Sequence, residues 1–184
     1  MPSPIDEILG VKSDPQLKAR RQAKRVALAA VAEICFESER FVHLSDLTPS
    51  KVVQAGLFDT ALRFRRDRSS AGTPIRLGGA AYAKGLGLHS RCELTYGVAG
   101  EYVTFAAVAG IDAAADRRGN ATLKVLGDGK ELIKPVKLVG GAPPVPVRCD
   151  LSGIKQLTIL VDFGDDGIDV GDHVDLADAR LVKP

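Results

Sequence analysis

This sequence of 184 residues contains no tryptophan, and its other aromatic residues are three tyrosines and six phenylalanines. Aromatic rings supply much of the contact area in many ligand-binding sites, because they bury a large flat surface and often carry a polar tip. A binding site in this chain therefore has few rings to draw on. The three tyrosines are Tyr82, Tyr96 and Tyr102.

Cysteine is also scarce. Cys35, Cys92 and Cys149 lie far apart and show no Cys-x-x-Cys spacing. An odd number of cysteines cannot form a complete disulfide framework. We interpret all three as small, buried apolar residues, which is the usual environment of a free cysteine.

Long apolar runs are missing as well. The sequence has no run of 18 or more apolar residues, so it predicts no membrane span. Its net charge of +2 gives no overall attraction for nucleic acid. A basic stretch at 20–25 precedes an apolar stretch at 26–34, an order found in secretory signal peptides. Glu33 interrupts the apolar stretch and both lie far from Met1, which argues against a cleaved signal peptide.

The two parts of the chain differ in composition and hydrophobic pattern, and we expect an N-terminal extension at 1–43 followed by one folded domain at 44–184. In the extension, Asp14 precedes a proline at a reasonable helix start, and 16–30 is rich in good helix formers. From 26 to 36 apolar residues alternate, which fits a strand instead. The extension is therefore predicted to be a short helix followed by a strand, or mixed.

The domain at 44–184 shows short alternating apolar runs separated by Gly, Pro, Asn and Asp, without the strand-helix alternation of a parallel sheet. This pattern predicts an all-β fold, an antiparallel β-sandwich. The clearest hairpin is expected at the Gly127-Asp128-Gly129 turn. Strands are expected at 52–58, 62–64, 75–77, 82–89, 93–98, 102–111, 122–126, 131–136, 147–151, 157–163 and 177–182, with an extended edge at the prolines of 143–146.

One candidate functional segment is 84–90, Lys-Gly-Leu-Gly-Leu-His-Ser, in which two glycines permit close backbone approach and a histidine ends a strand. The segment lacks the third glycine and the following helix of a dinucleotide-binding loop, and it has no Gly-Lys-Ser or Gly-Lys-Thr ending. Nucleotide binding through it is therefore not predicted. His89 is either a structural histidine or a polar contact to a ligand.

A second candidate, 111–120, carries Asp112, Arg117 and Arg118 between two expected strands. The planar guanidinium of arginine suits paired hydroxyls or a carboxylate, and aspartate accepts hydrogen bonds from adjacent hydroxyls. The segment is therefore a candidate for binding a polyhydroxylated ligand. The alternative is a solvated turn with a local ion pair of small energy.

The third candidate is the acidic, glycine-rich segment 162–178. Calcium prefers six to eight oxygen ligands in flexible geometry, so Asp172 and Asp175 are candidate ligands of a structural calcium ion. The spacing differs from that of the twelve-residue helical calcium loop. A solvated or hydroxyl-binding loop is the alternative.

Catalysis is not predicted. Only His43, His89 and His173 are available as histidine bases, and neither a Gly-x-Ser-x-Gly elbow nor a His-Glu-x-x-His zinc helix occurs. A glycosidase needs two positioned carboxylates, for which the acids of the domain are candidates. A small single sandwich makes that reading the weaker one.

Four stretches of the domain, taken in order, resemble the NPCBM domain, a family of carbohydrate-binding modules in the galactose-binding-like class. The resemblance implies a jelly-roll β-sandwich that binds galactose-type or related glycans without catalysis. It also implies that the partner is a glycan or glycoprotein, that the module accompanies other domains of a larger protein, and that it is extracytoplasmic or secreted. The stretches are 82–90, 93–96, 125–130 and 171–181.

The resemblance also implies a site. His89 falls in the family's Gly-x-Gly-x-His turn, Asp112 at the end of its Gly-Ile-Asp strand, and His173 in its final loop. We expect the histidines and Asp112 to bind the glycan together with Arg118 and Tyr82. The final loop also holds the candidate calcium ligands, Asp172 and Asp175.

One departure concerns Leu176, which stands where the family commonly has tryptophan. A sugar-stacking tryptophan there would leave this chain with weak binding or none, whereas at a core position Leu176 merely repacks. Its place in the closing strand favours the core. The alternative function is a structural or protein-interaction sandwich that has lost sugar binding. Convergence of His89, Asp112, Arg118 and His173 at one end of the sandwich would favour sugar binding, and their dispersal would favour a scaffold.

Overall fold

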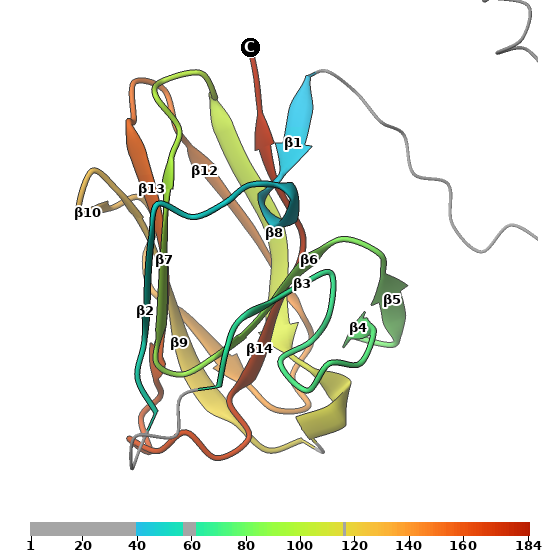
Figure 1. The fold of residues 1–184 in the computed structure, drawn as a ribbon. Coiled ribbons are helices and arrows are strands. Elements are labelled where there is room, and N and C mark those ends of the chain that lie inside the picture. The colour runs from blue at the N-terminus through green and yellow to red at the C-terminus, as the bar shows by residue number, and fades with distance from the viewer. Residues whose placement is uncertain (1–39, 57–61, 116) are drawn as a thin grey trace, which may run out of the picture. The chain divides into compact units, whose positions relative to one another are not determined.

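The computed structural model describes residues 40–56, 62–115 and 117–184, which belong to the compact unit Ser38–Pro184. Most of the predicted helix-and-strand extension, and Cys35 with it, lies outside the described residues. Two antiparallel sheets face each other, so the predicted all-β sandwich is confirmed (Figure 1). No helix in these described ranges is long and apolar enough to cross a membrane.

Sheet A has the strand order β12-β8-β14-β6-β3, and β1 also pairs with β14. The long strand β14 is therefore its centre, with β8 on one side and β6 on the other. The strands are β1 (Phe41–His43), β3 (Arg65–Arg66), β6 (Gly85–His89), β8 (Thr104–Ile111), β12 (Val145–Asp150) and β14 (His173–Val182).

Sheet B has the order β10-β9-β13-β7-β2, and β11 also pairs with β9. The predicted hairpin is confirmed, because Gly127 pairs with Lys130 across a turn in which Asp128 and Gly129 both have positive φ. The strands are β2 (Lys51–Gln54), β7 (Cys92–Gly97), β9 (Asn120–Gly127), β10 (Lys130–Glu131), β11 (Val136–Val139) and β13 (Gln156–Phe163).

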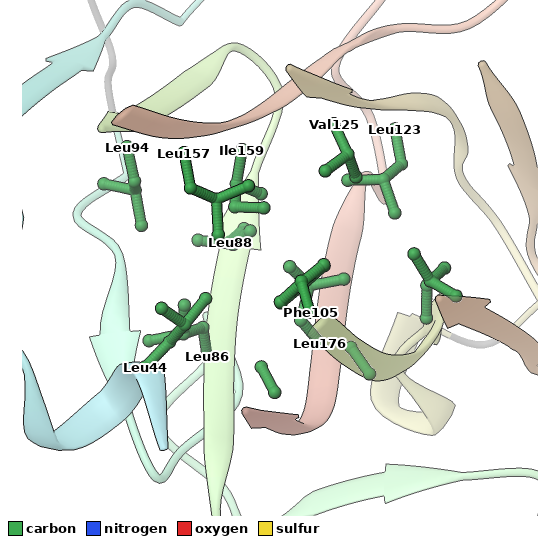
Figure 2. Packing of buried hydrophobic residues seen from close by; sticks show 14 of the residues in the cluster. Leu44, Leu86, Leu88, Leu94, Phe105, Leu123, Val125, Leu157, Ile159 and Leu176 are labelled. Atoms are coloured by element: carbon green, nitrogen blue, oxygen red, sulfur yellow. The ribbon is translucent and has the colours of Figure 1, made fainter. Parts of the chain in front are cut away.

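The core lies between the sheets and is made of alternate strand residues, as a half-buried strand requires (Figure 2). In β9, for example, Ala121, Leu123 and Val125 are fully buried while the residues between them are partly exposed. Leu176 is also fully buried in this cluster, which confirms the expectation that it is a core residue. Cys92 and Cys149 are buried free thiols, as predicted.

The outer face of sheet A is covered by residues 67–82, which include the hairpin of β4 (Ile75–Leu77) and β5 (Ala80–Tyr82). Ile75 and Leu77 pack on Ala177 of β14. The covering chain approaches so closely that a Cβ on Gly87 would lie 2.3 Å from the carbonyl oxygen of Arg68. This contact explains why Gly87 in the Gly-Leu-Gly-Leu-His motif carries no side chain.

Several predicted strand boundaries are wrong. Residues 62–64 form no strand, and 131–136 is divided between β10 and β11. The closing strand begins at His173 rather than at 177, so His173 and Asp175 belong to β14 and not to a loop. The density of acidic residues suggested a loop there, but Asp175 is paired with glycines of both β6 and β8, and His173 is paired with the last residue of β6.

Candidate ligand-binding site

Two histidines lie side by side on the outer face of sheet A. His89 ends β6 and His173 begins β14, and the two residues are direct partners in the antiparallel register. Their rings meet edge to face with centroids 5.2 Å apart. His89 is buried and His173 is half-buried. The motif that delivers His89 to a strand end thus places it against a second histidine from 84 residues further along the chain.

The hydrogen bonds of the histidine pair define what it can offer a ligand. His89 Nδ1 lies 2.9 Å from the carbonyl oxygen of Ser90, which can only accept, so Nδ1 carries the proton. In neutral His89, Nε2 is then an acceptor. His173 Nδ1 lies 2.5 Å from Ser70 Oγ. Burial lowers the pKa of His173, and positive charge at His89 or Arg118 acts in the same direction, while Asp112 and Asp172 oppose the shift; the net lowering favours the neutral ring.

Asp172 is a fully buried carboxyl group that ties three segments together. Ser90 Oγ donates to its Oδ2 at 2.5 Å, and the backbone N–H of Asn120 donates to its Oδ1 at 2.8 Å. Burial raises the pKa of Asp172, while these two hydrogen bonds oppose the shift. The end of β6, the start of β9 and the turn before β14 are thereby fixed relative to one another.

Arg118 lies exposed at the rim of the histidine pair, on the loop that follows the short helix η4 (Ala113–Ala115). The loop packs so tightly on the turn before β14 that a Cβ on Gly171 would lie 2.8 Å from Arg118 Cβ. Within the described ranges Arg118 forms no ion pair or side-chain hydrogen bond. The backbone of Arg118 is therefore fixed by packing, while its guanidinium is exposed and close enough to His173 for its charge to act on that ring.

Asp112 and Asp175 form a buried pair beneath the site. Asp112 accepts hydrogen bonds from the backbone N–H of Ala114 at 2.8 Å and of Arg76 at 3.4 Å. Its own N–H donates to the carbonyl oxygen of His173 at 2.7 Å. Asp112 thus connects η4, the covering hairpin and β14, and only 3% of it is exposed.

Asp175 has no exposed surface and, as a carboxylate, would leave both oxygens without a hydrogen-bond donor. Burial, together with the Asp112 carboxyl group, raises the pKa of Asp175 to about 9. The group is therefore protonated at neutral pH, and its O–H can donate to the Asp112 carboxyl group, while the backbone N–H of Arg76 opposes the shift. Its neighbours in the register are Gly87 and Gly110, which leave room for the acid pair.

The structure brings four of the predicted site residues together, namely His89, His173, Asp112 and Arg118. By the criterion set out from the sequence, convergence of these residues favours sugar binding over a scaffold. Tyr82 is not among them, because it packs with Ile75 and Leu77 over Ala177. Ala177 is four residues along β14 from His173, a separation of about 13 Å.

Two serines of the site were missed by sequence reasoning. Ser90 follows His89 directly, so its position in the motif could have drawn attention to it. Ser70 gave no signal, because its contact with His173 spans 103 positions in the chain. Only the covering segment brings it to the histidine pair.

The described part of the chain contains no cluster of ligands for the predicted calcium ion. No group of three or more His, Cys, Asp or Glu side chains in the described ranges is arranged to hold a metal ion. Asp172 accepts from Ser90 and Asn120, whereas Asp175 lies against Asp112. The two carboxyl groups are engaged by different partners.

Comparison with known proteins gives a family and a fold. The model of the NPCBM/NEW2 domain family matches residues 40–182. A solved chain of *Clostridium perfringens* ZmpB with a catalytic domain and the modules CBM51-1 and CBM51-2 is 34% identical, with a TM-score of 0.69 over 78% of this chain and 15% of that chain. The CBM51-2 and INT domains of the same protein, solved with GlcNAc, are 29% identical with a TM-score of 0.69 and coverage of 78% and 32%.

A third solved structure is the CBM51 module of *Clostridium perfringens* GH95 in complex with methyl-galactose. It is 25% identical with a TM-score of 0.67, and the match covers 77% of this chain and 99% of that module. Among curated proteins, one named endo-alpha-N-acetylgalactosaminidase from *Renibacterium salmoninarum* is 38% identical over 90 residues. That match covers 49% of this chain and only 6% of the relative.

Proposed function

Since this chain belongs to the NPCBM/NEW2 domain family, we propose that its sandwich is a non-catalytic carbohydrate-binding module for galactose-type glycans. The observation that carries the proposal is the meeting of His89, His173 and Arg118 at one end of sheet A. These side chains come from three segments, and each has a polar group that bonds to no other protein group within residues 40–56, 62–115 and 117–184.

The site provides complementary hydrogen-bonding groups for a sugar. A hydroxyl of the ligand donates to Nε2 of neutral His89, because Nδ1 is already used on Ser90. Arg118 donates from its planar guanidinium to two adjacent oxygens of the ring. His173 is oriented by Ser70 and presents its other ring nitrogen. Asp112 acts from beneath, because it holds the start of β14 and the Arg118 loop rather than the ligand.

The leucine at position 176 is no argument against sugar binding. The side chain is fully buried between the sheets and pairs with Leu86 and Ala109. A tryptophan at this position would lie in the core, so its absence removes no ring from the surface that faces a ligand. The galactose preference is supported by the relative solved with methyl-galactose. The match to a small part of long, multidomain relatives further supports a module that accompanies other domains of a larger protein.

Calorimetric titration tests the proposal. We expect methyl β-galactoside to bind with a dissociation constant on the order of millimolar, because a monosaccharide buries little area against the cost of its lost freedom. Binding should be tested in parallel with N-acetylgalactosamine and N-acetylglucosamine. Substitution R118A should weaken binding by roughly tenfold or more, since it removes charge-assisted hydrogen bonds.

The matched control is R148A, which removes an exposed arginine of β12. It should leave both the far-ultraviolet circular dichroism spectrum and the affinity unchanged. A folded wild-type protein that binds none of the three sugars at tens of millimolar would rule the proposal out. Binding of glucose-type but not galactose-type sugars would overturn only the ligand class.

A further inference from the structure

The tyrosines of the chain do not provide the apolar surface that a sugar ring needs beside the histidine pair. Tyr96 is buried in the core, and Tyr82 lies over Ala177. Tyr102 precedes β8 while Asp112 follows it, so the eight residues of the strand separate them by about 26 Å. An apolar contact for a sugar bound at His89 therefore has to come from elsewhere.

Exposed aliphatic side chains are present on the segment that leads into His173. Val170 is 56% exposed and Ile168 is 44% exposed, and both belong to the loop between β13 and β14. Val170 is the most exposed large apolar residue in the described ranges. In Figure 1 this loop lies at the same end of the sandwich as η4, whose following loop carries Arg118.

The backbone places Val170 at the corner of a tight turn directly before the site. The N–H of Asp172 donates to the carbonyl oxygen of Asp169 at 3.2 Å, and Gly171 has a φ of 83°. These are features of a type II turn with glycine at its third position. The N–H of His173 then donates to the carbonyl oxygen of Gly171 at 2.7 Å, so the chain passes from the turn straight into the histidine pair.

Packing fixes this turn against the arginine loop. A Cβ on Gly119 would lie 2.2 Å from the carbonyl oxygen of Gly171, so the two backbones are in direct contact. Asp172 anchors the other side through Ser90 and Asn120. Val170 is therefore an exposed apolar residue on a braced turn whose backbone contacts the Arg118 loop and leads directly into His173.

Given the carbohydrate-binding function proposed above, we infer that Val170 and Ile168 form an aliphatic surface on which the apolar face of the bound sugar rests. The hydroxyl edge of the same sugar meets His89 and Arg118. The C–H groups of a galactose ring supply the matching apolar face. Removal of the two Val170 methyl groups should weaken binding roughly three- to tenfold, because a sugar covers only part of them, whereas full burial at about 0.8 kcal/mol for each group would correspond to about fifteenfold.

Methyl-labelled nuclear magnetic resonance of the full 184-residue chain locates the contact directly. During titration with methyl β-galactoside, the Val170 and Ile168 methyl signals should shift with the dissociation constant measured by calorimetry. The methyls of Val52 and Val53 serve as controls, because these residues are similarly exposed on the edge strand β2 of the other sheet. Shifts confined to other residues would overturn the inference.

Variants give the second readout. V170A should show the three- to tenfold loss, V170D a larger loss, and V170F should retain or improve affinity, while V53A should bind as the wild type does. Equal affinities in all four variants would overturn the aliphatic surface and leave the carbohydrate-binding function standing, because R118A would still lose binding. Failure of the wild-type protein to bind any sugar would overturn both.

Discussion

Replacement of Asp175 by asparagine should stabilise this protein. Asp175 is fully buried beside Asp112, and its pKa is raised to about 9. Asparagine has nearly the same shape, and its amide N–H can donate to Asp112 in place of the acid proton. The substitution therefore keeps the neutral character of the native group while removing its ability to ionise in the unfolded chain.

The size of the effect follows from proton linkage. In the unfolded chain Asp175 has the ordinary value of 3.8, so it is ionised at pH 7 and must take up a proton on folding. Over the roughly 3 pH units from that value to pH 7, uptake costs about 4 kcal/mol. The variant avoids this cost but exchanges a strong acid–carboxylate hydrogen bond for an amide one. We therefore expect a net gain of roughly 2 to 4 kcal/mol at pH 7.

The pH dependence gives a sharper test than the gain itself. Because the folded-state pKa of Asp175 exceeds the unfolded one, its contribution is fully present below pH 3.8 and is lost as the pH rises toward 9. Between pH 5 and 8 the native state holds one more proton than the unfolded state at this group. The free energy by which D175N exceeds the wild type should then grow by about 1.4 kcal/mol per pH unit.

Urea denaturation at pH 5, 6, 7 and 8 measures this difference. Far-ultraviolet circular dichroism is the suitable probe, because the chain has no tryptophan for fluorescence. The control D166N removes an exposed carboxylate and should produce a small difference without that slope. A D175N difference that is flat with pH, or a variant less stable than the wild type at pH 8, would show that Asp175 is ionised in the folded state.

Three further predictions concern the core and the turns. L176W should destabilise the chain by roughly 1 to 3 kcal/mol through overpacking, without improving sugar affinity in calorimetry, because Leu176 is fully buried. G171A should lower the free energy of unfolding by about 1 kcal/mol or more and weaken sugar binding, since Gly171 has positive φ and no room for a Cβ against Arg118. Urea denaturation measures the first effect and calorimetric titration the second. Burial raises the pKa of Cys92 to about 12 and of Cys149 to about 11, so both thiols should be unreactive in the folded protein. In a variant with the third cysteine changed to serine, Ellman's reagent at pH 8 should therefore react only after denaturation.

The alternation of apolar and polar residues predicted the strands that have one face buried in the core. Burial alternates strictly along β9 and along most of β8 and β13, and the sequence alone places these strands within two residues of their observed ends. The start of β14 was missed because its acidic residues resemble a solvated loop. Asp175 lies within a sheet because it is neutral there, and that neutrality depends on Asp112, which is distant in the sequence.

The site was predictable in part for the same reason. His89 and His173 were found from their motifs, but their direct pairing is a property of the register between β6 and β14. The covering segment that brings Ser70 to His173 carries no periodic signal, and most of its residues are exposed. Only the structure shows that the glycines of β6 allow this segment to approach the sheet so closely.

The buried acids explain how a sandwich with few aromatic rings can still hold a precise polar site. Asp172 accepts hydrogen bonds from Ser90 and from a backbone N–H group, and Asp112 accepts hydrogen bonds from backbone N–H groups. Both side chains are buried. Each instead connects a loop to the end of a strand, and the loop after η4 carries the exposed Arg118. Because loops without such anchors are mobile, a donor on them would lose conformational entropy on binding. The acids that the sequence suggested as ligand or metal contacts are therefore better explained as the frame that positions the proposed sugar-binding histidines and the loop of Arg118.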